Sequence, residues 1–209
     1  MEDVLALYER PDDPREPVVC WDEKPVALHA EVRAPRPARP GHVAKRDNEY
    51  RRCGTANIFG IVAPKAGRHL NRVTPTRSGR EFALALQGLV TAYPRARTIH
   101  LVLDNLNIRC EHSLVPVFGQ RRARQLWRRL TIHYTPKHGS WLNQAEIELS
   151  LLARQALGTD RIPNRALLGQ RIRAWTSRAN RRQTRINWRF TRKQARTKFK
   201  YKPTTRSKT

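Results

Sequence analysis

The feature that most constrains the fold of this chain is a continuously apolar segment, "TIHLVLD", at residues 98–104. A strand with one face in water alternates apolar and polar side chains, so a continuous apolar run favours a strand covered on both faces, in a sheet with helices above and below. The run ends in Asp104, and Asn105 and Asn107 follow it. Two interpretations remain open here: turn formation, which Asp and Asn favour, or a carboxylate placed at the strand end as a metal ligand.

The residues before this segment predict an antiparallel meander followed by a helix. Residues 18–32 and 55–64 are rich in β-branched and apolar residues and predict two strands, separated by the proline-rich segment 33–42. Residues 68–74 predict a third strand. Ser78, with Glu81 three residues later, matches a capping box and predicts the start of a helix that ends at Pro94.

The residues after Asp104 predict two more helices and one more strand. We expect a helix over 119–130, a short strand over 131–136 and a helix over 140–157. The order is three antiparallel strands, then helix, strand, helix, strand and helix, which describes a mixed α/β sheet. Ligand sites in such sheets lie at the carboxyl ends of the central strands, where Asp104 is expected.

Charge indicates a polyanionic partner. The chain has 209 residues, with 42 Lys and Arg against 17 Asp and Glu, and a formal charge of +25. Nucleic acid is the expected partner. No apolar run approaches the roughly 18 residues of a membrane span, and the acidic start does not resemble a secretory signal. We therefore expect a cytoplasmic, nucleoid-associated protein. Three cysteines without a C-x-x-C pair predict neither a zinc ribbon nor a disulfide framework.

The basic residues gather toward the carboxyl end, and no Asp or Glu lies beyond Asp160. Residues 161–190 predict a basic helical extension with an apolar stripe, and residues 191–209 a basic, disordered tail. Residues 1–15 are expected to form a linker or arm, and 16–160 the main domain. The arginines of the extension that we expect to contact DNA phosphates are Arg171, Arg173, Arg181 and Arg182.

Candidate partners for Asp104 are acids on other elements. Asp22 lies within an otherwise good strand, where Asp is disfavoured, and its period of two places it on one face with Val18 and Cys20. A hairpin turn around Asp22 is an equally weighted alternative. Glu146 and Glu148 are two residues apart on a helix, about 200° around its axis, so only one of them can face a metal site. For Glu146, a capping role with Asn143 remains open and is slightly favoured by spacing alone.

Three motifs resemble one known family. The segments "CWDEKPV", "LVLDNLN" and "HYTPKHGSWLNQAEIELS" are similar to the catalytic core of insertion-sequence transposases of the mariner-like superfamily, which carry a DDE endonuclease domain. The resemblance extends to about Phe190. It implies a ribonuclease-H-like, retroviral-integrase-like fold with a mixed five-stranded sheet, three of whose strands are antiparallel. It also implies that the catalytic and metal-binding acids are Asp22, Asp104 and Glu146.

The implied activity is a DNA transposase with two divalent ions, Mg²⁺ or Mn²⁺. DNA is cut at the transposon ends, and the freed 3′ hydroxyl then attacks target DNA. Asp22 bridges both ions in this scheme, while Asp104 and Glu146 each bind one. Lys137 and His138 are expected to hold the phosphate or position the nucleophile, although His138 is equally compatible with an ordinary surface loop. Trp141 is expected in the core, with stacking on an unpaired base as the alternative.

Some features depart from the family pattern. Complete members carry an amino-terminal helix-turn-helix region, which we do not find before residue 16. We therefore expect a separate helix-turn-helix polypeptide as a partner, or else a truncated, inactive remnant that only binds DNA non-specifically. Arg109 stands where a histidine is more typical, and Asn105 and Asn107 are expected to orient the site. The resemblance also implies a homodimer that acts on paired ends.

Overall fold

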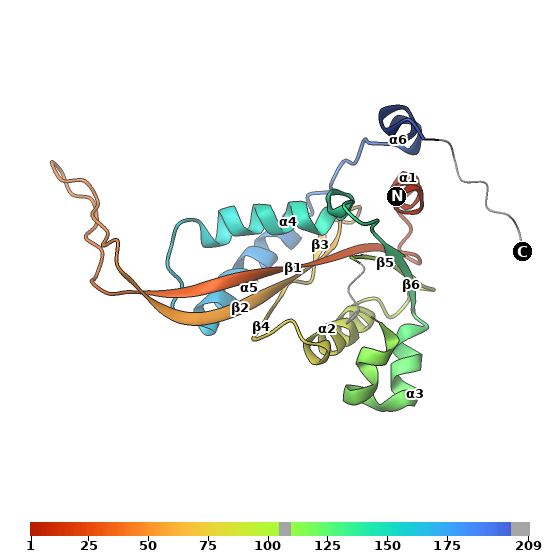
Figure 1. The fold of residues 1–209 in the computed structure, drawn as a ribbon, viewed down its shortest axis with the longest axis horizontal. Helices are drawn as coiled ribbons and strands as arrows, with labels where there is room; N and C mark the ends of the chain where they lie inside the picture. The colour runs from red at the N-terminus through yellow and green to blue at the C-terminus, as the bar shows by residue number, and fades with distance from the viewer. Residues whose placement is uncertain (105–109, 202–209) are drawn as a thin grey trace, which may run out of the picture.

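The computed structural model describes residues 1–104 and 110–201 (Figure 1). The strands are β1 (Val18–Glu31), β2 (Tyr50–Ala63), β3 (Arg68–His69), β4 (Arg72–Thr74), β5 (Ile99–Leu103) and β6 (Leu130–Tyr134). The α-helices are α1 (Glu2–Glu9), α2 (Gly79–Ala92), α3 (Val115–Trp127), α4 (Gln144–Leu152), α5 (Arg165–Arg182) and α6 (Arg192–Phe199). Short 3-10 helices precede α3 and α4, and a π-helical turn, Ala153–Leu157, continues α4. Within the described part of the chain, no helix is long and apolar enough to cross a membrane.

The sheet is mixed, as expected, with the strand order β3-β2-β1-β5-β6 and β4 paired to β2. β1 pairs antiparallel with β2, whereas β5 pairs parallel with both β1 and β6. The sheet has six strands rather than the predicted five, because the expected third strand is interrupted at Leu70 and Asn71. The side chain of Asn71 leaves the sheet to donate a hydrogen bond to Thr176 of α5, 3.1 Å away.

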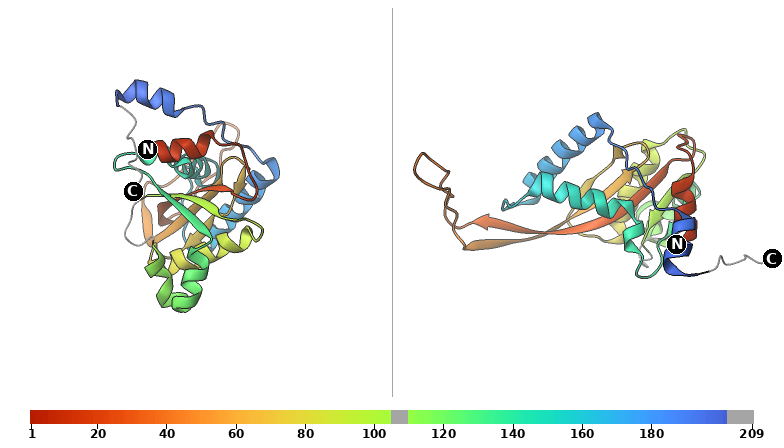
Figure 2. Two further views of the ribbon diagram at one scale, coloured as in Figure 1. Left: turned by 90° about the vertical axis from the view of Figure 1, so that its right-hand side faces the viewer. Right: turned by 90° about the horizontal axis from the view of Figure 1, so that it is seen from above.

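A long hairpin extends from the body of the molecule. β1 and β2 continue beyond the rest of the sheet, and the segment that connects them, residues 32–49, forms its tip (Figure 1 and, seen from above, Figure 2). Two isolated bridges, Arg36 with Lys45 and Arg39 with His42, hold the two sides of the tip together. The proline-rich loop of the sequence is therefore the end of an arm.

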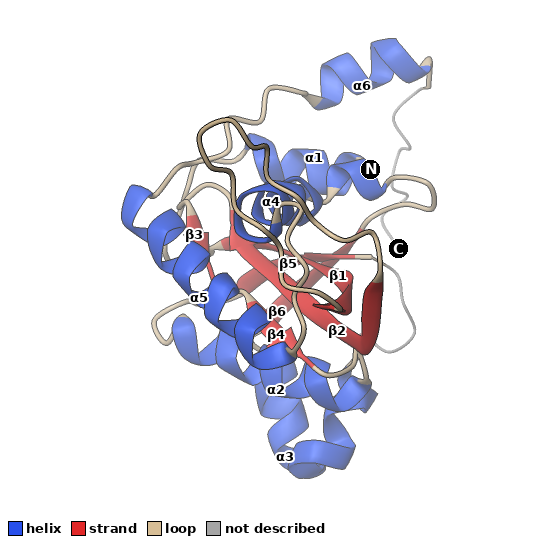
Figure 3. Ribbon diagram, turned by 90° about the vertical axis from the view of Figure 1, so that its left-hand side faces the viewer, coloured by secondary structure: helices blue, strands red, loops and turns tan. Residues whose placement is uncertain are grey.

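Helices cover both faces of the sheet, as the apolar run around β5 predicts. Alternate residues Trp21, Leu101 and Leu103 belong to a core cluster that also contains apolar side chains of α2 and α3. The intervening residues Cys20 and Val102 belong to a second cluster with side chains of α1 and α4. Figure 3 shows α1 and α4 on one side of the sheet and α2 and α3 on the other. All five residues of β5 are buried.

The helix predicted from the capping box is α2. Ser78 is its N-cap and accepts a hydrogen bond from the backbone N–H of Glu81, 3.5 Å away. The helix ends at Ala92, two residues before Pro94. The next predicted helix begins earlier than expected, at Val115, and contains a kink at Gly119, where φ is 73°.

The two chain ends differ from the expected arm and disordered tail. Residues 2–9 form α1, whose Val4, Leu5 and Leu7 are fully or almost fully buried. Residues 192–199 form α6, which begins with a capping box at Thr191. Ion pairs join the two helices: Arg196 binds Glu2 at 2.7 Å and Arg192 binds Glu9 at 2.8 Å. Opposite charges far apart in the sequence thus order segments whose composition alone predicts neither helix (Figure 1).

Candidate functional site

Asp22 and Asp104 lie on neighbouring parallel strands in matching positions. The register of β1 and β5 pairs Val18 with His100 and Cys20 with Val102. Two residues further along each strand, this register brings Asp22 beside Asp104, which directly follows β5. Partners in a parallel pair point to the same face, so both carboxylates belong to the face of Cys20 and Val102. Asp22 is not in a hairpin turn, because β1 continues to Glu31.

Helix α4 covers this face, and its first residues are fixed next to Asp22. Asn143, the N-cap of α4, donates a hydrogen bond from Nδ2 to the carbonyl oxygen of Trp21, 2.8 Å away. Ala145 packs in the same core cluster as Cys20 and Val102. The beginning of α4 is therefore bonded to the residue before Asp22 and packs in the cluster that contains Cys20 and Val102, each two residues before an aspartate.

Gly60 allows α4 to lie very close to the sheet. Gly60 is the β2 partner of Asp22, and a Cβ atom added to it would lie only 2.5 to 2.9 Å from side-chain atoms of Leu149. A glycine inside a strand commonly marks such a close approach. The sequence signal for this contact is the glycine in the middle of "NIFGIVA", which strand periodicity and capping patterns do not reveal.

The rotation of α4 separates Glu146 from Glu148. Glu148 is directed toward β3, where its Oε2 lies 2.9 Å from Nε2 of His69. Glu146 is two residues earlier and hence about 200° around the helix axis, on the opposite flank of α4. In the strand order β3-β2-β1-β5, the flank opposite β3 is the β5 side, which holds Asp104. The side chain of Glu146 is exposed there.

At the start of α4, Asn143 makes the capping hydrogen bonds. The side chain of Asn143 accepts a hydrogen bond from the backbone N–H of Ala145, 3.2 Å away, and its backbone oxygen accepts one from the N–H of Glu146. Asn143 therefore starts the helix, as the alternative assumed.

The donor chemistry of the three acids suits hard cations such as Mg²⁺ and Mn²⁺, which prefer carboxylate oxygens. Asp22 belongs to β1, Asp104 directly follows β5, and Glu146 belongs to α4, which packs on the face of Cys20 and Val102. Among residues 1–104 and 110–201, however, no group of three or more His, Cys, Asp or Glu side chains is arranged to hold a metal ion. The elements that carry the three carboxylates are neighbours in the fold, but within the described residues the side chains do not form a closed metal site.

Cys20 is two residues before Asp22 on β1, and its thiol is held in the protonated form. It is fully buried, and burial raises the pKa of its thiol to about 12. Its Sγ is 3.2 Å from the hydroxyl of Tyr8, which also donates a hydrogen bond to the carbonyl oxygen of Leu142 at 2.7 Å. Cys20 and Tyr8 support the floor of the site and attach α1 to it.

Lys137 and His138 lie in a turn near the same edge of the sheet. The register pairs Leu103 with Tyr134, and the backbone N–H of Thr135 donates to the oxygen of Leu103. The turn that follows exposes both predicted residues, and His138 has a positive φ of 62°. They are therefore near Asp104 in the fold, on the outside of the loop that precedes α4.

The predicted DNA-binding arginines of α5 fall into two groups. Arg171 is engaged within the protein, because its Nη1 lies 2.8 Å from Oδ2 of Asp160 and 3.4 Å from the oxygen of Ala156. Arg173, Arg181 and Arg182 are exposed. None of these four comes from the strands that carry Asp22 and Asp104. The predicted roles of Asn105, Asn107 and Arg109 lie outside the described residues.

Trp141 does not have the expected core position. Its exposed fraction is 40%, and its ring stacks on Trp188 with centroids 6.3 Å apart. Phe190 and Phe199 also contact it, so Trp141 is part of a surface aromatic cluster that attaches the segment leading to α6. His100 and His133 are buried.

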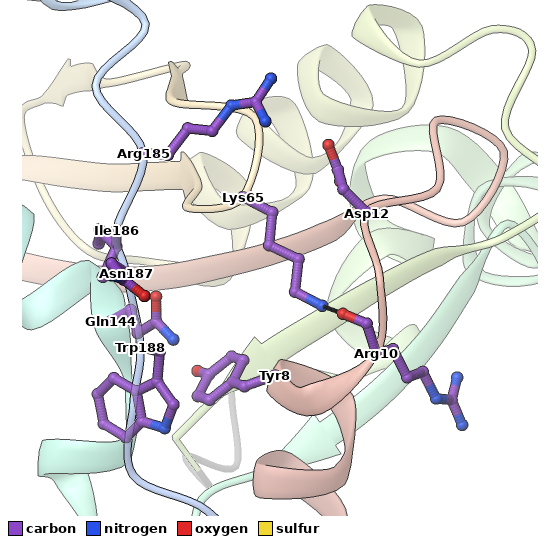
Figure 4. Close-up of a pocket in the computed structure, with 9 residues that line it drawn as sticks. All are labelled: Tyr8, Arg10, Asp12, Lys65, Gln144, Arg185, Ile186, Asn187 and Trp188. Atoms are coloured by element: carbon purple, nitrogen blue, oxygen red, sulfur yellow. Dashed lines mark hydrogen bonds between the residues drawn. The ribbon is translucent and has the colours of Figure 1, made fainter.

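A cavity of about 370 Å³ lies behind α4, on the flank away from Glu146. Figure 4 shows Gln144 and Trp188 on one side of it and Lys65 on the other. The ammonium group of Lys65 donates to the backbone oxygens of Leu7 and Arg10 at the end of α1, and burial lowers its pKa. This cavity lies where α1, α4 and the carboxyl-terminal segment meet. None of the predicted carboxylates, Asp22, Asp104 and Glu146, lines it. Its lining residues are Tyr8, Arg10, Asp12, Lys65, Gln144, Arg185, Ile186, Asn187 and Trp188.

Comparison with solved structures identifies the fold. A structure described as the Mos1 mariner paired end complex with Mn matches with a TM-score of 0.56 and 15% identity, covering 88% of this chain and 55% of that chain. The Mos1 transposase paired-end complex with left transposon end matches with a TM-score of 0.56 and 14% identity, covering 88% and 56%. This chain thus spans a little over half the length of these proteins. The similarity confirms the ribonuclease-H-like fold expected from the sequence. No curated protein matches the chain.

The family is shown by a sequence model rather than by these structures. The family described as DDE superfamily endonuclease matches residues 17–168, which is most of the chain and includes Asp22, Asp104 and Glu146. The same range includes the whole sheet and α4. The chain therefore belongs to the DDE superfamily of endonucleases.

Proposed function

We propose that this chain is the catalytic domain of a DNA transposase. In this proposal the protein cuts DNA at transposon ends and joins the freed 3′ hydroxyl to target DNA. The observation that carries it is the alignment of Asp22 with Asp104 on parallel strands, beneath a helix whose rotation directs Glu146 to the same side. Membership of the endonuclease family supports the cleavage step.

Asp22, Asp104 and Glu146 are the proposed ligands of two divalent ions, Mg²⁺ or Mn²⁺. Bound there, such ions lower the pKa of a hydroxyl nucleophile and neutralise charge on the phosphate. The similar Mos1 structures include complexes with Mn and with Mg. Because the three side chains are not closed around one point, we expect that binding of the ions and DNA draws Glu146 toward the two aspartates.

The remaining roles follow from position. Lys137 and His138, exposed beside the end of β6, are proposed to contact the phosphate next to the scissile bond. Arg173, Arg181 and Arg182 are proposed to contact DNA further away, whereas Arg171 is held by Asp160. DNA is the proposed partner, in the form of transposon ends and target. A homodimer on paired ends is proposed by analogy with the paired-end complexes of the similar structures.

The decisive experiment compares parent and Asp104→Asn proteins for nicking of supercoiled plasmid DNA with Mg²⁺, Mn²⁺ or EDTA. We expect metal-dependent nicking by the parent and a decrease of at least about 10²-fold in the variant, because the ions that activate the nucleophile are held less well. Circular dichroism checks that the variant stays folded. Equal nicking by the two proteins would refute the assignment of Asp104.

A matched pair of variants tests the choice between the two glutamates of α4. Glu146→Gln is expected to abolish nicking and to remove the rise in melting temperature that Mn²⁺ causes in the parent, because a ligand that binds the folded state stabilises it. Glu148→Gln keeps a hydrogen-bonding group for His69 and is expected to retain both properties. The reverse pattern would assign the third ligand to Glu148.

A further inference from the structure

His69 of β3 is held firmly within the protein. The residue is 3% exposed, and its ring packs edge-on against Trp175 of α5 with the ring centroids 5.2 Å apart. Asn180 of α5 fixes its backbone twice: Oδ1 of Asn180 accepts from the N–H of His69 at 2.7 Å, and Nδ2 donates to its carbonyl oxygen at 3.0 Å. His69 is therefore a rigid anchor for a group that binds to its ring.

The group that binds to this ring is Glu148 of α4. Nε2 of His69 lies 2.9 Å from Oε2 of Glu148, and because a carboxylate only accepts hydrogen bonds, the N–H of Nε2 donates. Nδ1 of His69 is buried and has no hydrogen-bond partner in the part of the chain that the structure describes. An apolar ring would fill the same space without an unpaired nitrogen, so packing alone does not account for a histidine at this position.

Glu148 has room to move if this hydrogen bond is lost. A cavity of about 250 Å³ lies beside it, and Arg178 and Arg182 of α5 also line that cavity. The side chain of Glu148 is 14% exposed, and a carboxylate that is mostly buried requires a partner. Without His69, we expect the two guanidinium groups to draw the carboxylate toward α5.

The hydrogen bond lies where it can oppose rotation of α4. Asn143 holds the start of the helix on β1, and Leu149 packs on Gly60 of β2, so these two contacts hold α4 down on the sheet. His69 holds the helix from its flank, on the side of β3. A contact on the flank has a lever arm about the helix axis, and it therefore limits rotation more than a contact directly beneath the axis does.

A small rotation of α4 would displace Glu146 considerably. Glu146 lies on the opposite flank of the helix from Glu148, because the two residues are two positions apart. A helix with its side chains has a radius of about 5 to 6 Å, so a rotation of about 20° moves a carboxylate by about 2 Å. The groups of a working metal site must be held within about 0.5 Å of their productive positions. The rotation of α4 therefore decides whether Glu146 can serve as a ligand.

We propose that His69 is a positioning residue for the metal site. By holding Glu148, it fixes the rotation of α4 and thereby the direction of Glu146. This inference rests on the proposed function, in which Glu146 is a ligand of divalent ions. His69 binds neither the ions nor DNA in this scheme, and it acts on metal affinity through α4.

The test is the affinity of the full chain for Mn²⁺ without DNA, measured by electron paramagnetic resonance of the free ion. His69→Ala removes the hydrogen bond, and we expect the Kd for Mn²⁺ to rise by about 10- to 100-fold, the usual effect of losing a group that orients a metal ligand. His69→Gln places an amide N–H within reach of Glu148 and is expected to restore most of the affinity. Glu148→Ala removes the same hydrogen bond from α4, is expected to match His69→Ala, and decides the matter if His69→Ala does not fold.

Val90→Ala is the control for a merely structural role of His69. Val90 is buried in α2, in the core cluster on the face of the sheet away from α4. We expect Val90→Ala to lower the melting temperature and to bind Mn²⁺ as the parent does. The positioning role is wrong if His69→Ala binds Mn²⁺ as tightly as Val90→Ala, or if His69→Gln binds it as weakly as His69→Ala.

Asp104→Asn separates this inference from the proposed function. If Asp104→Asn binds Mn²⁺ as tightly as the parent, the proposed acids do not hold the ion, and both the proposed function and the role of His69 are rejected. If Asp104→Asn binds Mn²⁺ weakly and His69→Ala binds it as the parent does, only the role of His69 is rejected.

Discussion

At the scale of single residues, Gly60 decides how closely α4 approaches Asp22. The residue has no side chain, and Leu149 occupies the space where a Cβ atom would be. We expect Gly60→Ala to lower the free energy of unfolding by about 1 to 3 kcal/mol, because added atoms in a packed interface force neighbours to move. Urea denaturation measures the change.

Gly88 provides the control for this substitution. It lies within α2 and has no atom within 4 Å of an added Cβ, so Gly88→Ala is expected to stabilise the protein by up to about 1 kcal/mol. The steric explanation also predicts non-additivity. Leu149→Ala should cost less in the Gly60→Ala background than in the parent, and additive costs would contradict the contact.

For the individual site residues, the sequence predicted some orientations and left others open. The strand period placed Asp22 on the face of Cys20, and the structure agrees. Spacing on a helix showed that Glu146 and Glu148 face opposite ways but not which way each faces. The fold shows it, because Glu148 binds His69, a residue far from α4 in the sequence.

At the scale of elements, α1 is attached to the sheet partly through histidines. Nδ1 of His133 lies 2.6 Å from Oδ2 of Asp3 in α1, and its Nε2 lies 2.9 Å from Nδ1 of His100. Glu16 is 3.8 Å from the other nitrogen of His100. Burial, with His133 and Arg10 nearby, lowers the pKa of His100 despite the opposing effect of Glu16.

This lowered pKa predicts a decrease of stability in acid. In the unfolded chain His100 takes up a proton near its ordinary pKa of about 6.5, whereas in the folded protein it resists protonation until lower pH. The unfolded state therefore binds more protons as the pH falls below about 6.5, and the free energy of unfolding decreases. We expect lower stability at pH 5.5 than at pH 7.5, measured by urea denaturation, and a weaker dependence in His100→Gln.

His42 serves as the comparison, because it is exposed at the tip of the hairpin. His42→Gln is expected to leave the pH dependence as in the parent. If His100→Gln and His42→Gln have the same effect, the buried histidine does not contribute to the acid sensitivity.

Element prediction from sequence succeeded where local signals were strong. The capping residue Ser78 marks the start of α2, and the continuous apolar run marks β5. It was wrong in expecting one strand over 68–74, because Asn71 turns toward α5 and interrupts it. It also did not predict α1 and α6, short helices whose stability comes from packing and from the ion pairs between them.

At the scale of the whole molecule, the carboxyl-terminal segment supports only one side of the sheet. Trp188, Phe190 and Ala195 pack in the core cluster that includes α1 and Cys20. The cluster with α2 and α3 contains no described residue beyond Ile132. The two faces therefore depend differently on the end of the chain.

Removal of residues 183–209 should consequently weaken the fold without abolishing it. We expect the melting temperature to fall by roughly 5 to 10 °C, because apolar burial worth a few kcal/mol is removed. Differential scanning calorimetry measures the fall, and hydrogen exchange should locate the decrease in protection in α1 rather than in α2. An unchanged melting temperature would show that α6 does not stabilise the body.

The sequence by itself determined which residues form β1, β5, α2 and α4 and which acids are available, because strand period, apolar runs and caps are local properties. It also predicted a polyanionic partner, since net charge is a sum over the chain. Only the tertiary structure decided the parallel register that relates Asp22 to Asp104, and that Glu148 of α4 binds His69 while Glu146 lies on the other flank of the helix. Those relations depend on strand register and helix rotation, which contacts between distant residues fix and no local pattern encodes.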